Sequence, residues 1–540
     1  MKIAELIVKC LEAEGVEYIF GLPGEEILEL LEALTSSKIR FVLTRDERGA
    51  AFMANTWGRL SWKPGVCLST LGPGALNMAT GIADAYLDFA PLVAITAQAK
   101  TTRLHRESHQ YVDILSTFKP LTKWNTRIGW GSKVSEVLRK AFKVSLGEKR
   151  GPVHLEIPED IMSLPTDEEP MRPSDFACHG PSEEALSLAI EVIRESREPL
   201  ILAGNGVIRG DASGKLRDFS RKAEIPVTTT FMGMGSIPAD DRLFISTIGL
   251  QSRDWISCGF DRTDLIIAIG YDPVEFSTEY WGKDKKILHI NATSAEVDLH
   301  YHDVTEVIGD IKKTLSLLTE RISEKKDPSY FMKLKGLAVR SMEGELSGFP
   351  LKPLRVVKEI RDALGRKDIL ISDVGAHKIW IGRFYPALEE NTVLISNGLS
   401  SMGFALPSAI SAKLLFPGRK VVAAVGDGGF LMSVAELETA VRFRLPFVTL
   451  IFNDGGLGLI AWKERLKYKK DFFVRFGNPD FVKLAESFGA KGYRVSSDDG
   501  LAPVLRNALT QDGPVVIDCP VDYSENFVLS EKLGGVICPM

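Results

Sequence analysis

Short runs of Val, Ile and Leu alternate along this chain with longer windows in which apolar residues recur at helical spacing. Four of the apolar runs lie in "PLILAGNGV", "DLIIAIGYD", "DILISDVG" and "PFVTLIFND". Uninterrupted apolar runs that end in turn residues are typical of strands buried on both faces, and the helical windows supply the crossover connections between them. The pattern therefore predicts an α/β fold of doubly wound parallel sheets with helices on both faces.

Two changes of composition divide the chain into three units. The segment 158–182 is polar and rich in proline, and a charged segment begins at Arg321. A chain of 540 residues is about three times as long as a typical domain, so each unit is long enough for a core of its own. The predicted domains are residues 1–165, 183–325 and 350–525, and a tail follows at 526–540.

Composition and charge restrict the kinds of partner and the location that fit this chain. The chain is 45% hydrophobic and 25% charged, and its net charge of -5 is spread without long blocks of like charge, so nothing indicates a nucleic acid or an anionic membrane as partner. Residues 1–20 place charges between apolar residues at helical spacing, which predicts an amphipathic helix rather than a signal peptide. No apolar run approaches the roughly 20 residues of a membrane span.

The cysteines point to a cytoplasmic protein. They are far apart in sequence and form no C-x-x-C pair, which favours buried free thiols in a reducing cytosol over a disulfide framework or a zinc site. The six residues are Cys10, Cys67, Cys178, Cys258, Cys519 and Cys538.

The strongest chemical signal is an acid between glycines at the end of a predicted strand. The run "VVAAV" leads into Gly426, Asp427, Gly428 and Gly429, a helical window follows, and the next strand, "PFVTLIF", ends at Asn453. A right-handed crossover makes the two strands parallel, so Asp427 and Asn453 both lie at carboxyl ends, where open α/β sheets bind their ligands. Two oxygen ligands suit Mg²⁺, and the glycines let backbone N–H groups approach a phosphate.

Other interpretations of this loop stay open at this point. Asp427 can simply cap the following helix, and Asn453 can simply shape a turn. A Rossmann fingerprint would make the protein a nicotinamide- or flavin-binding oxidoreductase, but that motif needs a third glycine where this chain has Leu431. The pairing of the two loops favours a site for a cation and a phosphate.

Gly426-Asp427-Gly428 with the later Asn453 resembles the thiamin diphosphate (ThDP) signature, in which Asp, Asn and a backbone carbonyl hold the cofactor's metal ion. The resemblance implies that Asp427, Asn453 and the carbonyl of Gly455 bind Mg²⁺. The family usually has two adjacent asparagines. Here Phe452 replaces the first, whereas the ligand normally comes from the second.

The resemblance extends over nearly the whole chain and is closest to the large subunits of acetolactate (acetohydroxyacid) synthases. It implies three domains of the ThDP-binding fold, which are a pyrimidine-binding, a central and a diphosphate-binding domain. The segments that carry it are "FGLPGE" at 20–25, "GPGALN" at 72–77, "GPVHLEIPEDI" at 151–161, "TFMGMGSIP" at 230–238, "DVGAHKIW" at 373–380 and "SSMGFALPSAI" at 400–410. The implied cofactor contacts are Pro23, Gly24, Pro73, Asn77, Ala376, His377, Ser400, Met402, Gly426, Gly428, Gly429 and Asn453.

Glu47 lies where a predicted strand, "IRFVLT", meets a predicted helix, "RDERGAAFMANTWGRL". The helix dipole can explain an acid at this place, and a methionine such as Met402 is ordinarily core filler. The resemblance instead implies that Glu47 activates ThDP by sharing a proton with its aminopyrimidine, and that Met402 supports the bent cofactor under its thiazolium ring. It also implies that the carbonyl of Ser400 accepts the 4′-amino hydrogen and that backbone near His377 contacts the diphosphate.

His109 and Gln110 bear on the reaction type. Sites like that of pyruvate decarboxylase often protonate the decarboxylated substrate with two adjacent histidines, whereas glutamine at 110 cannot act as an acid near neutral pH. The pair can also be an ordinary solvent-facing one. The resemblance implies that the enamine survives to attack a second 2-oxo acid, so we expect two pyruvates to give 2-acetolactate and CO₂. The alternatives are another ThDP-dependent 2-oxo acid decarboxylase or carboligase, and a cofactor-binding protein that has lost activity.

Two sequence features give conflicting indications about FAD binding and about the acceptor substrate. Acetohydroxyacid synthases of branched-chain biosynthesis bind FAD with an arginine-containing segment, whereas "YDPVEFSTEYW" at 271–281 is similar to catabolic, FAD-free acetolactate synthases. Trp462 resembles the pocket tryptophan associated with selection for 2-oxobutyrate in the biosynthetic type. We therefore expect His109 and Trp462 in the substrate pocket, ThDP and Mg²⁺ as cofactors, and no FAD.

The expected site combines distant parts of the chain. Glu47 lies in the first predicted domain and the metal ligands lie in the third, yet both must touch one small cofactor. In ThDP relatives the first domain of one subunit faces the third domain of its partner. The resemblance therefore implies a homodimer or homotetramer with sites shared between chains.

Overall fold

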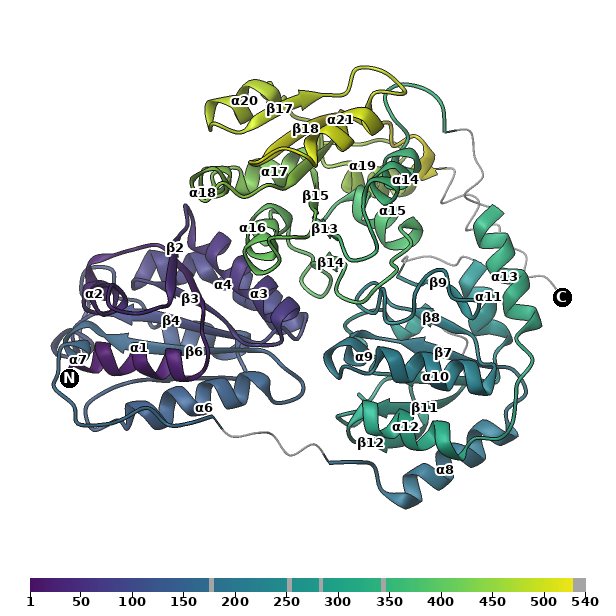
Figure 1. Cartoon of the computed structure of the whole chain (residues 1–540), viewed down its shortest axis with the longest axis horizontal. Helices are drawn as coiled ribbons and strands as arrows, with labels where there is room; N and C mark the ends of the chain where they lie inside the picture. The colour runs from purple at the N-terminus through teal and green to yellow at the C-terminus, as the bar shows by residue number, and fades with distance from the viewer. Residues whose placement is uncertain (174–178, 250–254, 281–284, 341–345, 528–540) are drawn as a thin grey trace.

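The computed structural model of the chain describes residues 1–173, 179–249, 255–280, 285–340 and 346–527. This part of the chain forms three sheets of six strands each, and neighbouring strands pair in parallel. Figure 1 shows the sheets in separate regions, with the first in purple and blue, the central one in teal and the third in green to yellow. Helices cover both faces of each sheet, so the predicted α/β fold of doubly wound parallel sheets is confirmed.

The first sheet has the strand order β2-β1-β3-β4-β6-β5. Its strands are β1 (Tyr18–Gly21), β2 (Arg40–Leu43), β3 (Gly65–Ser69), β4 (Leu92–Gln98), β5 (Trp124–Arg127) and β6 (Pro152–Pro158). Its helices are α1 (Ile3–Ala13), α2 (Leu28–Leu34), α3 (Glu47–Ser61), α4 (Gly72–Leu87), α5 (Ile114–Phe118), α6 (Val134–Leu146) and α7 (Glu159–Met162). Strands β3 and β4 are buried along their whole lengths, which explains their largely apolar sequences.

The central sheet has the order β12-β11-β10-β7-β8-β9, which is the strand order typical of dinucleotide-binding sheets. Its strands are β7 (Pro199–Ala203), β8 (Val227–Thr229), β9 (Phe244–Thr247), β10 (Leu265–Ile269), β11 (Lys286–Asn291) and β12 (Asp303–Ile308). Its helices are α8 (Glu183–Glu195), α9 (Asn205–Arg209), α10 (Ser213–Ala223), α11 (Trp255–Arg262), α12 (Ile311–Arg321) and α13 (Ser329–Arg340).

The third sheet has the order β14-β13-β15-β16-β18-β17, which repeats the order of the first sheet strand for strand. Its strands are β13 (Ile369–Ser372), β14 (Val393–Ile395), β15 (Val421–Gly426), β16 (Val448–Asn453), β17 (Lys491–Arg494) and β18 (Val515–Pro520). Its helices are α14 (Pro353–Ala363), α15 (Ala376–Phe384), α16 (Ala405–Leu415), α17 (Asp427–Ser433), α18 (Glu436–Arg442), α19 (Gly458–Tyr468), α20 (Phe481–Ser487) and α21 (Leu501–Ala508).

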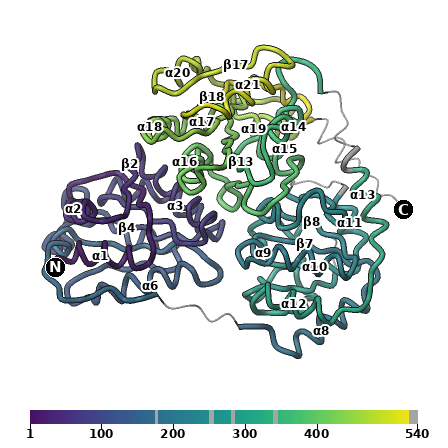
Figure 2. Tube along the Cα trace, viewed as in Figure 1, coloured from purple at the N-terminus to yellow at the C-terminus, as the bar shows by residue number. Residues whose placement is uncertain are grey.

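One hydrophobic core joins the first and third domains. Helix α16 lies between the third sheet and the helices α3 and α4 of the first, as Figures 1 and 2 show. The Phe52 and Phe404 rings meet edge to face with their centroids 5.6 Å apart. Beside them the buried hydroxyl of Thr56 donates to that of Ser408 over 2.8 Å. The two sheets that carry the predicted cofactor residues are therefore held together within one chain.

The structure corrects one expectation about the cysteines. Cys10, Cys67 and Cys519 are free and buried, as predicted, but Cys258 is disulfide-bonded. Distance in sequence does not limit which cysteines a fold brings together, so the prediction of a free thiol is wrong at this position. Cys178, Cys538 and most of the predicted tail lie outside the described residues.

The predicted amphipathic helix at the start of the chain is α1, whose apolar face is buried. None of the helices in the described ranges is both long and apolar enough to cross a membrane. Each sheet lies inside one of the three predicted domains.

Candidate active site

The loops at the carboxyl ends of β13, β14, β15 and β16 surround a pocket of ≈ 240 Å³. These four strands are neighbours in the third sheet, so residues from distant parts of the sequence converge at one edge. The predicted cofactor residues that line this pocket are Ala376, His377, Ser400, Met402, Gly426, Asp427, Gly428 and Gly429.

Asp427 is the centre of the hydrogen bonds in this pocket. It begins helix α17 and is almost completely buried. Its Oδ2 accepts hydrogen bonds from the backbone N–H of Gly455 and from Nδ2 of Asn478, both over 2.8 Å. Its Oδ1 accepts from the N–H of Gly428 over 2.8 Å. The carboxylate therefore ties the loop after β15 to the loop after β16.

Asn453 and Gly455 lie beside Asp427. The Asn453 Nδ2 donates to Asp518 Oδ1 over 2.8 Å, which turns Asn453 Oδ1 towards Asn478, whose Nδ2 lies 3.0 Å away. The Gly455 carbonyl accepts from the N–H of Phe476 over 3.3 Å. The three predicted ligand oxygens thus belong to one hydrogen-bonded cluster.

A cation in this cluster would depend on mixed oxygen donors. Within the described ranges no group of three or more His, Cys, Asp and Glu side chains could hold a metal ion. The donors offered here are one carboxylate, one amide oxygen and one backbone carbonyl, which is a set of hard ligands with room for phosphate oxygens and water. The donor set therefore fits a magnesium-like ion that arrives with a phosphorylated cofactor.

His377 contributes an unsatisfied nitrogen to the pocket. Its ring stacks on Phe452 at a centroid distance of 5.3 Å, and its Nε2 is buried without a hydrogen-bond partner among the described residues. Burial lowers the pKa of His377 to about 3, so the imidazole is neutral at pH 7. A buried polar atom of this kind is ordinarily satisfied, which is consistent with a ligand group at this place.

Asp373 joins the loops after β13 and β14, a role that the sequence pattern does not predict. This buried carboxyl accepts from the N–H groups of Val374, Gly403 and Ala405 over 2.7 to 3.0 Å. Burial raises its pKa to about 6. A Cβ at Gly429 would come within 3.0 Å of Asp373 Oδ1, so the glycine lets the loops after β13 and β15 close on each other.

Ser400 and Met402 sit on the loop after β14. Ser400 has a φ of 56°, and its hydroxyl accepts from the buried Nζ of Lys378 over 2.9 Å. Burial lowers the pKa of Lys378 to about 8. A Cβ at Gly428 would lie 3.4 Å from Met402 Cε, which places the methionine side chain over the glycine loop, inside the pocket.

The first domain gathers a second group of predicted residues. They follow β1, β2, β3 and β4, which are also four neighbouring strands. Glu47 is 5% exposed, and its Oε2 accepts from Asn77 Nδ2 over 3.0 Å. A Cβ at Gly74 would lie 2.9 Å from Glu47 Oε1, so the glycine lets the carboxylate approach the first turn of α4 closely.

The remaining first-domain residues border this group. Pro73 lies in the first turn of α4, and Gly24 packs so closely on Thr70 that a Cβ would meet its Cβ at 2.5 Å. Gln110 has a φ of 58°, and its carbonyl lies 2.4 Å from where a Cβ of Gly72 would be. The other predicted residues of this group are Pro23, His109 and Gln110, and His109 and Gln110 are exposed.

Within one chain these two groups do not form a single pocket. The residues that line the third-domain pocket all lie between positions 374 and 523, and none of the described first-domain residues is among them. The turn before Glu47 instead contacts α18, because the backbone N–H groups of Arg45 and Asp46 donate to buried Glu436 over 2.9 and 3.0 Å. The predicted site residues thus form two separate groups in the chain, which we call half-sites.

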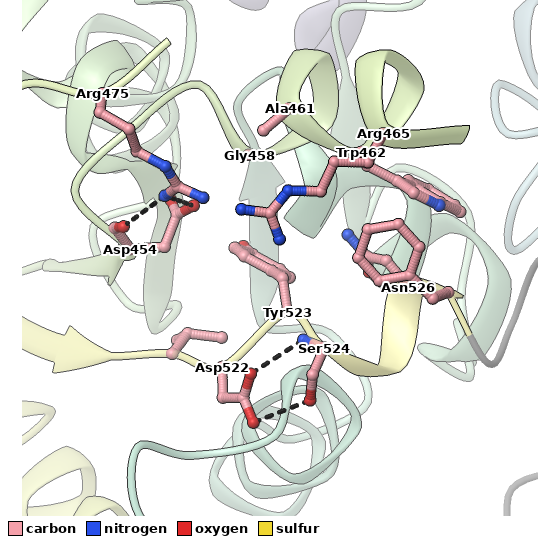
Figure 3. A pocket seen from close by; sticks show the side chains of 12 residues that line it. Asp454, Gly458, Ala461, Trp462, Arg465, Arg475, Asp522, Tyr523, Ser524 and Asn526 are labelled. Carbon is pink, nitrogen blue, oxygen red and sulfur yellow. Dashed lines mark hydrogen bonds and ion pairs between the residues drawn. The ribbon is translucent and has the colours of Figure 1, made fainter. Parts of the chain in front are cut away.

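Trp462 lines an adjacent pocket of ≈ 350 Å³, shown in Figure 3. Asp454, Gly458 and Tyr523 line both this pocket and the cofactor pocket. In Figure 3 the side chains of Arg465 and Arg475 extend towards each other near Tyr523. The structure therefore places the predicted substrate residue beside the cofactor pocket rather than in it.

Comparison with known proteins identifies three domains. Residues 1–117 match the N-terminal TPP binding domain of thiamine pyrophosphate enzymes, residues 186–318 match the central domain, and residues 373–519 match the C-terminal TPP binding domain. Thiamine pyrophosphate is another name for ThDP.

Several acetolactate synthases are similar to this chain over most of their lengths. The acetolactate synthase of Bacillus subtilis (strain 168) is 36% identical, covering 98% of this chain and 95% of its own. The catabolic acetolactate synthase of Raoultella terrigena is 34% identical, covering 98% and 97%. Acetolactate synthase 2, chloroplastic, of Nicotiana tabacum is 31% identical, covering 99% and 84%. Because three thiamine pyrophosphate enzyme domains match and these relatives are similar over nearly the whole chain, this chain belongs to the thiamine pyrophosphate enzymes and, among them, to the acetolactate synthase family.

Proposed function

We propose that this protein is a ThDP- and Mg²⁺-dependent acetolactate synthase, which joins two pyruvates to 2-acetolactate and releases CO₂. The observation that carries the proposal is the identity of 31 to 36% to acetolactate synthases over nearly the whole chain. The two half-sites support it, because they provide an activating carboxyl group on one sheet and a cation-binding oxygen cluster on another.

The third-domain pocket would hold the diphosphate and its cation. Asp427, Asn453 and the Gly455 carbonyl would bind Mg²⁺, and backbone near Ala376 and His377 would contact the diphosphate. Met402, which lies over the glycine loop, would support the thiazolium end. Bound ThDP supplies the electron sink that decarboxylation of a 2-oxo acid requires.

The first domain would supply the activating group and control the outcome. Glu47 would hold a proton for the aminopyrimidine, and Asn77 orients the glutamate by donating to its Oε2. Gln110 places an amide rather than an acid at the same edge, so this side chain cannot quench the reaction by protonating the decarboxylated substrate. That property favours carbon–carbon bond formation over aldehyde release.

We also propose that the enzyme works without FAD, because a side chain of the protein fills the central domain's ligand crevice. In a sheet of this order, a dinucleotide binds between the loops after β7 and β10. The Glu275 carboxyl group lies there and accepts from the N–H of Asn205, over 3.0 and 3.1 Å to its two oxygens, and from Thr230 Oγ1 over 2.5 Å. The N–H at the start of α9 is therefore already satisfied from within the chain.

Glycines bring the walls of this crevice into direct contact. A Cβ at Gly204 would lie 2.5 Å from the Gly270 carbonyl oxygen and 2.9 Å from Glu275 Oε1. Gly270 has a φ of 58°, and a Cβ there would meet the backbone nitrogen of Val207 at 2.4 Å. This close packing supports the proposal that no pyrophosphate enters between the two loops.

We further propose a homodimer or homotetramer with active sites shared between chains. Each chain carries both half-sites but does not join them, so a partner's first domain can complete the third-domain pocket. Exposed apolar side chains surround the half-sites, as expected for a surface that a partner covers. They include Leu76, Leu399, Met432, Ile460, Phe472, Phe473 and Phe476.

A cytoplasmic location is also proposed, on the evidence of the buried free thiols of Cys10, Cys67 and Cys519. The disulfide at Cys258 is the observation that counts against it.

The activity can be tested directly. The purified protein with ThDP, Mg²⁺ and pyruvate should release CO₂ and form 2-acetolactate, identified by mass spectrometry. In Glu47→Gln the amide keeps the shape but cannot share the proton, so hydrogen–deuterium exchange at C2 of bound ThDP should slow by orders of magnitude while ThDP still binds. Acetaldehyde as the main product would instead indicate a simple decarboxylase, and unchanged exchange in NMR would remove Glu47 from its proposed role.

Loss of the cation ligand should release the cofactor. Mg²⁺ should increase the ThDP affinity of the wild type, and this increase should be much smaller in Asp427→Ala. The loss should exceed the ~10 to 100-fold that is typical when a residue that only orients a metal ligand is removed. Calorimetry with ThDP, with and without Mg²⁺, measures this change. Asp512→Ala, at an exposed position of the same domain, serves as the control. Equal ThDP affinities in Asp427→Ala and wild type would disprove the metal assignment.

Flavin content provides a separate test. The purified protein should show no flavin absorbance, and its activity should not change on addition of FAD, because the Glu275 carboxyl fills the crevice. A stoichiometric flavin band, or activity that requires FAD, would overturn this part of the proposal.

Shared sites predict complementation. Glu47→Gln and Asp427→Ala proteins should each be inactive, and subunit exchange in an equal mixture should restore roughly a quarter of wild-type activity, since half of the dimers are mixed and each mixed dimer has one intact site. The control replaces the second protein with the Glu47→Gln/Asp427→Ala double variant, which should restore none. Mixed dimers that are seen by native mass spectrometry but remain inactive would contradict site sharing.

A further inference from the structure

The Asn478 side chain bridges the two side-chain oxygens of the proposed cation site. Its Nδ2 lies 2.8 Å from Asp427 Oδ2 and 3.0 Å from Asn453 Oδ1. An amide nitrogen carries two hydrogens, so it can donate to both oxygens at once. Because Asp427 follows β15 and Asn453 ends β16, this one nitrogen links the ends of two strands.

The surrounding network fixes the orientation of the Asn478 amide. Asn453 donates its own Nδ2 to Asp518, which leaves its Oδ1 to accept from Asn478. Reversing the Asn478 amide would place its oxygen against two acceptor oxygens, which is repulsive. In this orientation Asn478 Oδ1 is buried and has no hydrogen-bond partner within the described part of the chain, so the two bonds from Nδ2 are the side chain's hydrogen bonds there.

The backbone on both sides of Asn478 is anchored to the same site. On its N-terminal side, Leu457 N–H donates to the Val474 carbonyl over 2.9 Å, and Phe476 N–H donates to the Gly455 carbonyl over 3.3 Å. On its C-terminal side, α20 begins with Phe481, whose ring packs edge to face on Phe430 of α17. Asn478 is therefore held at a fixed distance from the loops it bridges.

These hydrogen bonds leave acceptor capacity for a cation. An ionised carboxylate offers about four lone-pair positions, and Asp427 uses three of them for Gly428, Gly455 and Asn478. The amide oxygen of Asn453 offers two, and only the bond from Asn478 is made within the described residues. One position remains on each group, which suits one oxygen–cation bond from each.

We propose that Asn478 is a positioning residue of the cation site, which sets the spacing of the Asp427 and Asn453 oxygens before the ion and the diphosphate bind. This inference rests on the proposed function, because it takes those two residues as the ligands. Mg²⁺ requires nearly ideal octahedral geometry, so free rotation of either side chain would cost affinity. Residues that orient metal ligands typically contribute about 10 to 100-fold to metal affinity.

Titration of Mg²⁺ into ThDP-saturated protein by calorimetry tests the proposal. Asn478→Ala should bind Mg²⁺ about 10 to 100-fold more weakly than wild type. Asn507→Ala is the matched control, because Asn507 is an exposed asparagine of the same domain whose Nδ2 donates to Tyr493 Oη. Its Mg²⁺ affinity should equal that of wild type. Asn478→Ser, whose hydroxyl can donate to only one oxygen, provides a second variant if the alanine protein does not fold.

A second measurement separates positioning from a merely structural contact. The thermal unfolding midpoint is recorded in chelator without ThDP, and again with saturating Mg²⁺ and ThDP. A positioning role predicts that the variant loses part of the ligand-dependent increase in the midpoint. A lower midpoint in chelator with Mg²⁺ affinity within about threefold of wild type would overturn the proposal. Asp427→Ala separates the positioning role of Asn478 from the metal assignment on which it rests. Unchanged Mg²⁺ affinity in Asp427→Ala would disprove the metal assignment itself.

Discussion

The parallel pairing of β15 with β16 is the constraint on which the cofactor pocket depends. In their register Gly426 pairs with Phe452, so Asp427, which follows β15, and Asn453, which ends β16, lie at the same edge of the sheet. The flanking strands β13 and β14 end at that edge too, and Asp373 joins their loops through three backbone N–H groups. The ends of four buried strands therefore position Asp373, Asp427 and Asn453, and the loops that follow these strands close the pocket around them.

The first and third sheets have the same strand order, and each carries one of the two proposed half-sites. Glu47 follows β2 and Asp427 follows β15, in sheets of equal topology that share the core around Phe52 and Phe404. That shared core fixes the first domain against the third through α3, α4 and α16. Strand-end loops add to this packing, because Arg45 and Asp46 donate to Glu436 and Ser396 donates to Asp84, yet the pocket beside Asp427 stays open.

The site residues that could be predicted from the sequence are those whose positions follow from the local pattern of apolar runs, helical windows and glycine turns. An apolar run followed by Gly-Asp-Gly identifies a strand end, and a right-handed crossover then requires Asn453 to lie at the same edge, so the pattern alone is enough to pair the two residues. Asp373, Asn478 and Glu275 lie in loops where no periodicity constrains the partner. Their roles depend on contacts across long stretches of sequence, which only the folded chain displays. The disulfide of Cys258 was missed for the same reason.

The central and third domains use a carboxyl group at equivalent strand-end crevices in opposite ways. Glu275 accepts hydrogen bonds from Asn205 and Thr230, and burial raises its pKa to about 8, so it closes its crevice as a largely neutral group. Asp427 is just as buried, but its partners leave one acceptor position unused, and the pocket beside it stays open. The two crevices thus differ because the carboxyl group of one is satisfied by its own chain, whereas that of the other keeps an acceptor position for the proposed cation.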